Sequence, residues 1–355
     1  MTDAAALIDL LDRLDKYPRT SLALLPTPLH QLQNFGASLG GPDLWIKRDD
    51  LTGLEGGGNK TRKLEYIVGD AVASGADMLV TVGAIQSNHT RQTAAAAAKA
   101  GLKCALLHCA WTKDAGPQYR AVGNLLISHL IGADLYVDET VRPIEDQGPL
   151  NEFVARLKKQ GHKPYLIPGG GSEHRLGCFG YIRCAAELAA QANESGQHFD
   201  YLVHCTGSSS TQAGLLAGFA ALDVKTRVIG IADDDETDIK RRRVRTLAND
   251  ALHELELSVR IEAPDVEVIA ASDNVYGEPD AAIIDGIQRL ARTEGLIADP
   301  VYEGRAIRGL LMLTEEVRFE KDAQILLMYL GGSPAIHAYA DHFGSIELRR
   351  IDAEV

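Results

Sequence analysis

The chain has 355 residues, which is longer than a single hydrophobic core usually supports, so we expect two domains or lobes. Its 45% hydrophobic and 24% charged residues are typical of a globular protein, and its net charge of -13 argues against nucleic acid as a partner. Residues 1–21 are acidic and lack the basic start and long apolar run of a signal peptide or membrane span, so we expect a cytoplasmic protein.

Short apolar runs alternate with longer Ala-rich segments of helical period from Asp43 onward. Strands are predicted at 44–47, 77–83, 103–109, 134–137, 201–207 and 227–233. Helices are predicted at 61–75, 89–101, 119–132, 179–192 and 211–222. Strands that alternate with helices form βαβ units, so the sequence predicts an α/β fold with parallel sheets. Two lobes would share one cleft.

The basic run Lys240–Arg245, KRRRVR, follows the acidic run Asp233–Asp238, DDDETD. Neighbouring opposite charges neutralise each other, so the pair predicts a solvated helix start rather than a nucleic-acid patch. The five cysteines form no C-x-x-C pair and are odd in number, which indicates buried free thiols. His89 has no second histidine or acid at ligand spacing, so no metal site is expected.

Three loops at predicted strand ends carry chemistry: GGGNK at 56–60, GAIQSNHT at 83–90 and TGSSSTQAG at 206–214. Ligands of α/β sheets bind at the carboxyl ends of strands. Hydroxyls and backbone N–H groups before a helix form an anion cradle suited to phosphate. A Ser/Thr-rich helix cap that binds no ligand would show the same sequence pattern. The third loop matches neither the P-loop nor the dinucleotide fingerprint, and it lacks the G-x-S-x-G of hydrolases.

A lysine on a glycine-rich turn, an Asn-bearing loop and a phosphate cradle together suggest pyridoxal 5'-phosphate (PLP). The motifs LPTPL, IKRDDLTGL, GGNKTRKLEY, GAIQSNHTRQTA, GSEH, STQAG, YGEP, DPVYEG and LGGSPAIHAY extend from about residue 25 to 339. In this order they resemble the fold-type II (tryptophan synthase β-like) PLP enzymes. The similarity is strongest to the 1-aminocyclopropane-1-carboxylate (ACC) deaminase and D-cysteine desulfhydrase group.

The resemblance implies a role for individual residues. Lys60 would form the Schiff base with PLP, Lys63 would contact the phosphate, and Asn88 would bond the 3'-oxygen. The phosphate cradle would consist of Gly207, Ser208, Ser209, Ser210 and Thr211. This loop departs from the Val-Thr-Gly-Ser-Thr typical of the deaminases.

The resemblance also implies a large PLP-binding domain, 1–60 with 173–355, and a small domain, 61–172. The active site would lie in the cleft between them. Enzymes of this group are usually homodimers, so the expected partners are a second copy of the chain and a small amino-acid substrate.

Two positions separate the branches of this group. The residue that faces the ring nitrogen is Glu in deaminases and Ser or Thr in desulfhydrases; here it is Glu303. The residue before the late Gly-Gly pair is Leu in deaminases and Thr in desulfhydrases; here it is Leu330. Both favour ACC deaminase, which opens the ACC ring to 2-oxobutanoate and ammonia. The alternative is a D-cysteine desulfhydrase or related C–S lyase, such as an L-cysteate sulfo-lyase.

Four further residues are implied beside the substrate. Ser87 would orient the substrate carboxylate, and Tyr302 would be a nucleophile or acid at the ring carbon. Trp111 and Tyr276 would line the pocket with Asn88. Ordinary structural roles stay open: Ser87 as a helix N-cap, the tyrosines as packing, and Glu303 as a solvated acid.

Overall fold

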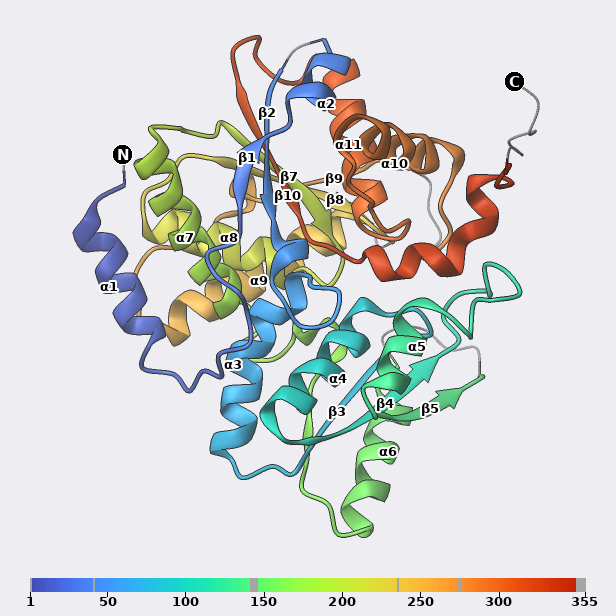
Figure 1. Ribbon diagram of the computed structural model, residues 1–355. Helices are drawn as coiled ribbons and strands as arrows, with labels where there is room; N and C mark the ends of the chain where they lie inside the picture. Colours follow the sequence, from blue (N-terminus) through green and yellow to red (C-terminus); the bar gives the residue numbers. More distant parts are fainter. Residues whose placement is uncertain (1, 41, 141–145, 235, 273–275, 349–355) are drawn as a thin grey trace.

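A computed structural model describes residues 2–40, 42–140, 146–234, 236–272 and 276–348. The chain forms two separate sheets, each flanked by helices (Figure 1). The predicted α/β class is therefore confirmed.

The first sheet has six strands in the order β1-β2-β10-β7-β8-β9. Its strands are β1 Leu29–Gln31, β2 Asp43–Arg48, β7 Tyr201–Thr206, β8 Arg227–Ala232, β9 Glu267–Ala270 and β10 Gln324–Tyr329. β1 pairs antiparallel with β2, and the other neighbours are parallel. The sheet is therefore mixed, with an antiparallel strand at one edge.

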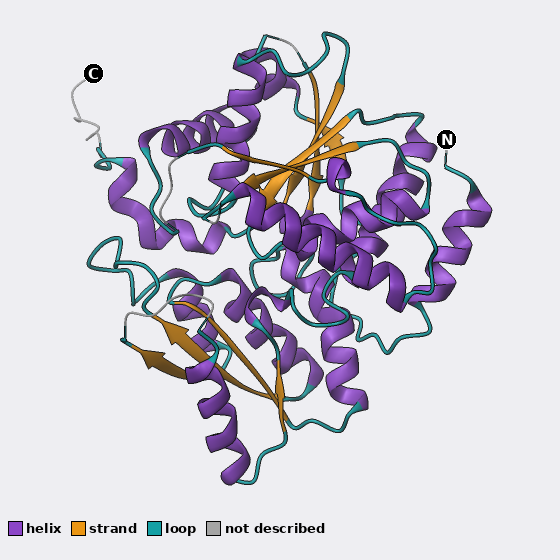
Figure 2. Ribbon diagram, turned by 180° about the vertical axis from the view of Figure 1, so that it is seen from behind, coloured by secondary structure: helices purple, strands orange, loops and turns teal. Residues whose placement is uncertain are grey.

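Helices cover both faces of this sheet (Figure 2). Strand residues alternate between the two cores, because successive side chains point to opposite faces: Leu202 packs on one side and Val203 on the other. The first core involves α1 Ala4–Leu14, α7 Phe179–Ser195, α8 Ser210–Ala221 and α9 Thr237–Glu254. The second involves α2 Gln33–Ser38, α10 Ala281–Glu294 and α11 Glu303–Glu315.

The second sheet has four parallel strands in the order β5-β4-β3-β6. They are β3 Met78–Ala84, β4 Lys103–Cys109, β5 Asp134–Asp138 and β6 Pro164–Leu166. The helices around it are α3 Asn59–Ala73, α4 Asn88–Ala100, α5 Gly123–Leu130 and α6 Gly148–Lys159. Short 3-10 turns complete the chain at η1 Asp49–Leu51, η2 Gly169–Gly171, η3 Ala263–Asp265 and η4 Ser333–Phe343.

The helix predicted at 119–132 starts later than expected, at Gly123. The side-chain amide of Gln86 donates to the carbonyl oxygens of Tyr119 and Val122. These carbonyls are held by a tertiary contact, and Val122 is extended. The first four residues of the predicted helix therefore form turns instead.

The second sheet draws all its strands from 78–166, inside the predicted small domain, and the strands of the first sheet lie outside it. We keep the division at residues 60/61 and 172/173 as a proposal. All five cysteines are buried, as predicted, and none of them forms a disulfide with another described residue. No helix in the described ranges is long and apolar enough to cross a membrane.

Candidate active site

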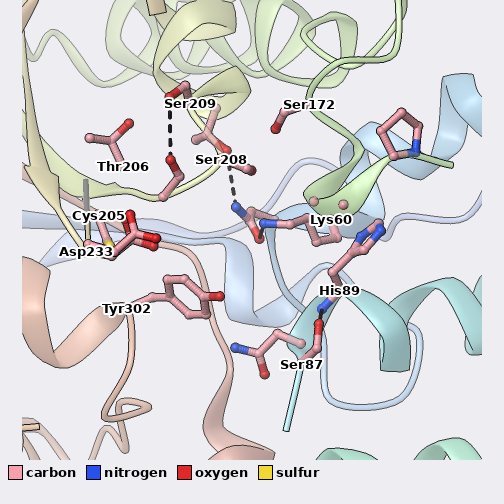
Figure 3. A pocket seen from close by; sticks show the side chains of 18 of the residues that line it. Lys60, Ser87, His89, Ser172, Cys205, Thr206, Ser208, Ser209, Asp233 and Tyr302 are labelled. Carbon is pink, nitrogen blue, oxygen red and sulfur yellow. Dashed lines mark hydrogen bonds between the residues drawn. The ribbon is translucent and has the colours of Figure 1, made fainter. Parts of the chain in front are cut away.

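A cavity of about 240 Å³ lies where the carboxyl ends of strands from both sheets meet. Most predicted site residues line it: Lys60, Ser87, Asn88, Trp111, Gly207, Ser208, Ser209, Thr211, Tyr276, Tyr302 and Leu330. Figure 3 shows several of them converging from different elements. Within the described part of the chain, Lys63, Ser210 and Glu303 are buried behind this wall rather than on it.

The glycine run before Lys60 is required by close packing. Gly57 has φ +56°, and a Cβ there would overlap the carbonyl oxygen of Asp50. Glycine is the residue that adopts positive φ without strain and leaves room for such an approach. Helix α3 begins directly after the glycine run, at Asn59, so Lys60 lies in the first turn of the helix and faces the cavity.

Lys60 is a half-buried cation in the wall of the cavity. Burial lowers its pKa to about 8, although the nearby Cys205, Asp233 and Asp299 oppose the shift. Its Nζ donates to Asn59 Oδ1 at 3.3 Å. A lysine with a lowered pKa has a larger uncharged fraction near neutral pH, which makes it a nucleophile.

The loop after β7 forms an anion cradle at the start of α8. Ser209 adopts φ +73°, a left-handed conformation that is uncommon for serine and that turns successive backbone N–H groups toward one side. Thr211 Oγ1 accepts from Asn59 Nδ2 at 3.1 Å, and the hydroxyls of Ser210 and Ser172 are 2.8 Å apart. The positive end of the helix dipole adds to the attraction for an anion.

Lys63 lies one turn after Lys60 on α3 and is 1% exposed. Burial lowers its pKa well below 10.5, and repulsion by Lys60 lowers it further. Among the described residues no hydrogen bond or ion pair involves its Nζ. An amine buried without an acidic partner among the described residues makes this part of the site suited to an anion.

Ser87 caps α4, as the structural alternative held, and it also lines the cavity. Its Oγ accepts from the backbone N–H groups of His89 at 3.2 Å and Thr90 at 3.3 Å. The next residue, Asn88, is 8% exposed, and its Oδ1 accepts from Asn124 Nδ2 at 2.8 Å. Both side chains are therefore held by neighbours while facing the cavity.

His89 also lines the cavity, which the sequence analysis did not predict. Its Nε2 lies 2.8 Å from Thr81 Oγ1. Burial lowers its pKa well below 6.5, and Lys60 and Lys63 lower it further. His89 is therefore a neutral imidazole in the cavity wall.

The two predicted tyrosines lie next to each other in the wall of the cavity. Tyr302 caps α11, and its Oη lies 2.6 Å from that of Tyr276. Burial raises the pKa of Tyr302 well above 10, and Tyr276 and Asp233 raise it further. Both phenols therefore keep their protons at neutral pH.

Glu303 is fully buried at the start of α11. Neither carboxyl oxygen has a side-chain hydrogen-bond partner in the described ranges. Burial raises its pKa well above 4.5, Asp299 raises it further, and the backbone N–H of Leu330 opposes the shift. This shift favours the protonated carboxyl, and its proton has no side-chain acceptor in the described ranges. The alternative of a solvated loop acid is wrong.

A cluster of acidic and basic residues completes the cavity wall: Asp233, Asp234, Lys240 and Arg243. None of these four was predicted from the sequence as a site residue. Lys240 is 1% exposed and lies 2.7 Å from a carboxyl oxygen of each aspartate, so the predicted solvated helix start is wrong at this position. Its Nζ also donates to Gly207 O at 3.0 Å. One sequence feature could have predicted this cluster: the acidic run follows a parallel strand, β8, and ligands bind at that edge of such sheets.

Comparisons with known proteins show which family the chain resembles. Residues 20–331 match the family described as pyridoxal-phosphate dependent enzyme. Over 339 residues the chain is 42% identical to 1-aminocyclopropane-1-carboxylate deaminase of Methylobacterium sp. (strain 4-46), covering 94% of this chain and 99% of the relative. The enzyme of the same name from Rhizobium leguminosarum bv. viciae is 41% identical over 343 residues, covering 95% and 99%.

Solved structures give the same result. The crystal structure of an ACC deaminase homologue matches with a TM-score of 0.85 at 35% identity, covering 94% of this chain and 98% of that one. O-ureido-L-serine synthase matches with a TM-score of 0.66 at 17% identity, covering 96% and 97%, which is a similarity of fold alone. The chain belongs to the family of pyridoxal-phosphate dependent enzymes.

Proposed function

We propose that this protein is an ACC deaminase, which converts ACC and water to 2-oxobutanoate and ammonia. Identities of 41–42% to two curated deaminases, over nearly the whole of both chains, support this substrate. The structural observation that carries the proposal is the buried carboxyl of Glu303, which has no side-chain partner among the described residues.

The residues of the cavity fit pyridoxal 5'-phosphate. Bound there, PLP supplies an electron sink for the substrate's α-carbon. Lys60 would attach it covalently, and Asn88 would donate to its 3'-oxygen. The phosphate would bind to Lys63 and the cradle at the start of α8, formed by Gly207, Ser208, Ser209, Ser210 and Thr211.

Glu303 meets a demand peculiar to ACC. This substrate has no hydrogen on its α-carbon, so the usual loss of an α-proton is impossible and the ring must open into a strong sink. A protonated pyridine nitrogen strengthens the sink. Because its pKa is raised and it has no side-chain partner in the described ranges, Glu303 would share a proton with the nitrogen. Leu330 would keep the ring edge apolar, without a competing hydroxyl.

Ser87 would receive the substrate carboxylate. Its oxygen already accepts from two backbone N–H groups, so its hydroxyl hydrogen is available to donate. The start of α4 adds the positive end of a helix dipole. Ser87 would also relay protons during ring opening.

Tyr302 would act at the ring carbon, as nucleophile or acid. Tyr276 would hold it through the bond between the two hydroxyls. Trp111 would complete the wall around a small amino acid.

One assay tests the substrate. The purified enzyme is offered ACC, D-cysteine and L-cysteate in parallel, and the oxoacid is identified. Formation of 2-oxobutanoate from ACC is expected. Pyruvate from a sulfur substrate, with ACC inert, would refute the proposal.

We further propose a cytoplasmic homodimer with a large domain, 1–60 with 173–355, and a small domain, 61–172. The family resemblance supports the dimer and the domain division, and the composition of residues 1–21 supports the location. Light scattering after size-exclusion chromatography should give twice 38.3 kDa at micromolar concentration. A mass of one chain would contradict the dimer.

A further inference from the structure

Arg91 is a fully buried cation whose hydrogen bonds go to neutral groups. It lies on α4 and is 0% exposed. No carboxylate of the described residues lies within ion-pair distance of it. Its Nε donates to Asn124 Oδ1 at 2.6 Å, its Nη2 to Gly57 O at 3.0 Å, and its Nη1 to Glu55 O. Burial of a charge without a counter-charge costs free energy. The role of Arg91 therefore lies in the groups that its three hydrogen bonds hold in place.

The first bond fixes the direction of two amides. Arginine only donates, so the Asn124 atom that faces Nε must be its oxygen. The amino group of Asn124 then points the other way and donates to Asn88 Oδ1 at 2.8 Å and to Gln86 O at 2.9 Å. Because its oxygen is occupied, Asn88 presents its NH₂ group to other partners, and Asn88 lines the cavity.

The other two bonds hold the glycine turn. Glu55 and Gly57 precede Lys60, and their carbonyl oxygens are fastened to α4 by the Arg91 guanidinium. Gln92 adds a second tie, since its Oε1 accepts from Thr61 N at 2.9 Å and its Nε2 donates to Asn88 O at 3.0 Å.

The spacing explains why one helix can do this. Asn88, Arg91 and Gln92 are separated by three and four positions, so they share a face of α4. That face is turned toward the start of α3, which carries Lys60.

We propose that Arg91 is a positioning residue: through Asn124 it turns the Asn88 amide so that its NH₂ faces the cofactor, and it holds the Lys60 turn against the same helix. The inference rests on the proposed contact between Asn88 and the 3'-oxygen of PLP. It adds a pair of residues, Arg91 and Asn124, that touch neither cofactor nor substrate.

The isosteric change Asn124→Asp tests the relay. A carboxylate would still accept from Arg91, but its second oxygen would repel Asn88 Oδ1, so the Asn88 amide would turn and present its oxygen to the cavity. The dissociation constants of the apoprotein for PLP and for the analogue that lacks the 3-hydroxyl are measured by spectrophotometric titration. We expect Asn124→Asp to weaken PLP binding by about tenfold or more and analogue binding by less than about twofold.

Two further variants guard against a general loss of structure. Arg91→Lys keeps the charge but cannot reach Asn124 and Gly57 together, so it should show the same selective loss. Thr93→Val is the matched control on α4, because the buried Thr93 hydroxyl donates within the helix to His89 O. This control should lower Tm without changing the ratio of the two dissociation constants.

Equal weakening of PLP and analogue in the folded Asn124→Asp and Arg91→Lys variants would overturn the proposal. So would wild-type affinity in both, or a wild type that binds the two ligands equally. Failure of the proposed function is distinguishable, because a protein that binds PLP but leaves ACC intact would refute the substrate and not the relay.

Discussion

The hydroxyl oxygens of Tyr276 and Tyr302 lie 2.6 Å apart on the wall of the cavity. Each phenol is both donor and acceptor, and one hydrogen occupies the bond between them. The second hydrogen is therefore left for a group in the cavity. Burial raises the pKa of both phenols, so neither loses its proton at neutral pH.

The tyrosine pair predicts unequal effects of the two Phe variants. Tyr302→Phe should lower kcat for ACC by about 10²- to 10⁴-fold, since it removes the group placed at the reacting carbon. Tyr276→Phe should have a smaller effect, because it removes a supporting bond. Steady-state kinetics with ACC measures both, and cofactor absorbance verifies that PLP remains bound. A Tyr302→Phe enzyme within tenfold of wild type would exclude the proposed role.

The positions of Glu303 and Leu330 predict a loss of ACC chemistry without a loss of cofactor. The double change Glu303→Ser with Leu330→Thr should abolish ACC turnover, because no acidic proton then faces the ring nitrogen. PLP binding should persist, since neither side chain is assigned to the phosphate or to Lys60. The test compares 2-oxobutanoate formation with PLP occupancy. Intact turnover in the double variant would contradict the pyridinium argument.

The buried carboxyl of Glu303 also predicts a pH dependence of stability. Its pKa in the folded protein is raised above 4.5, so above that pH the folded state binds a proton that the unfolded state has lost. Its contribution to stability therefore falls as pH rises. Glu303→Gln removes this titration, so the apo variant should gain Tm relative to the wild-type apoprotein between pH 5 and pH 8. A constant Tm difference across this range would show that Glu303 does not carry the effect.

Lys60 predicts a pH-dependent rate of cofactor attachment. Its amine is the nucleophile when uncharged, and burial lowers its pKa to about 8. The rate at which the apoprotein attaches PLP should rise as pH increases from 6.5 and level off above about 8.5. Stopped-flow absorbance follows the reaction, and Lys60→Ala should give no covalent product after borohydride reduction. A rate that keeps rising toward pH 10 would mean an ordinary lysine pKa.

Removal of the Lys240 side chain is expected to lower the free energy of unfolding strongly. Lys240 lies 2.7 Å from both Asp233 and Asp234; burial lowers its pKa, but the two aspartates outweigh burial and raise the pKa above 10.5. Lys240→Met would leave a buried acid uncompensated, so unfolding free energy should fall by about 3 kcal/mol or more. Lys225→Met is the control: this lysine pairs with Asp223 on the surface, at 82% side-chain exposure, and should cost below about 1 kcal/mol. Urea unfolding measures both. Similar losses would contradict the argument.

Local sequence predicted most of the architecture, because parallel strands and glycine turns have strong local signals. The triple glycine before Lys60 predicted a turn, and the positive φ of +56° at Gly57 fits one, whereas its close approach to Asp50 had no signal in the local sequence. Ser87 before an alanine-rich run predicted an N-cap, which α4 has. Strand ends predicted which loops meet at the cavity.

What could not be predicted depends on contacts between distant residues. In its basic run Lys240 resembles a surface lysine, and its burial follows from the packing of α9 on α8 and β9, which brings it to Asp233 after β8. The relay from Arg91 to Asn124 joins residues 33 positions apart and has no periodic signature. The delayed start of α5 likewise depends on Gln86, far upstream.

The ties made by Arg91 and Gln92 have a mechanical consequence. They join the turn of Lys60 to α4, while two residues later Arg62 forms ion pairs with Asp49 at 2.8 Å and with Glu187 of α7 at 2.9 Å. The backbone N–H of Asn59 also donates to Leu330 O at 2.9 Å, just after β10. Lys60 is therefore anchored to both sheets at once, and a rigid-body rotation of one sheet against the other would have to break the ties on one side of this lysine.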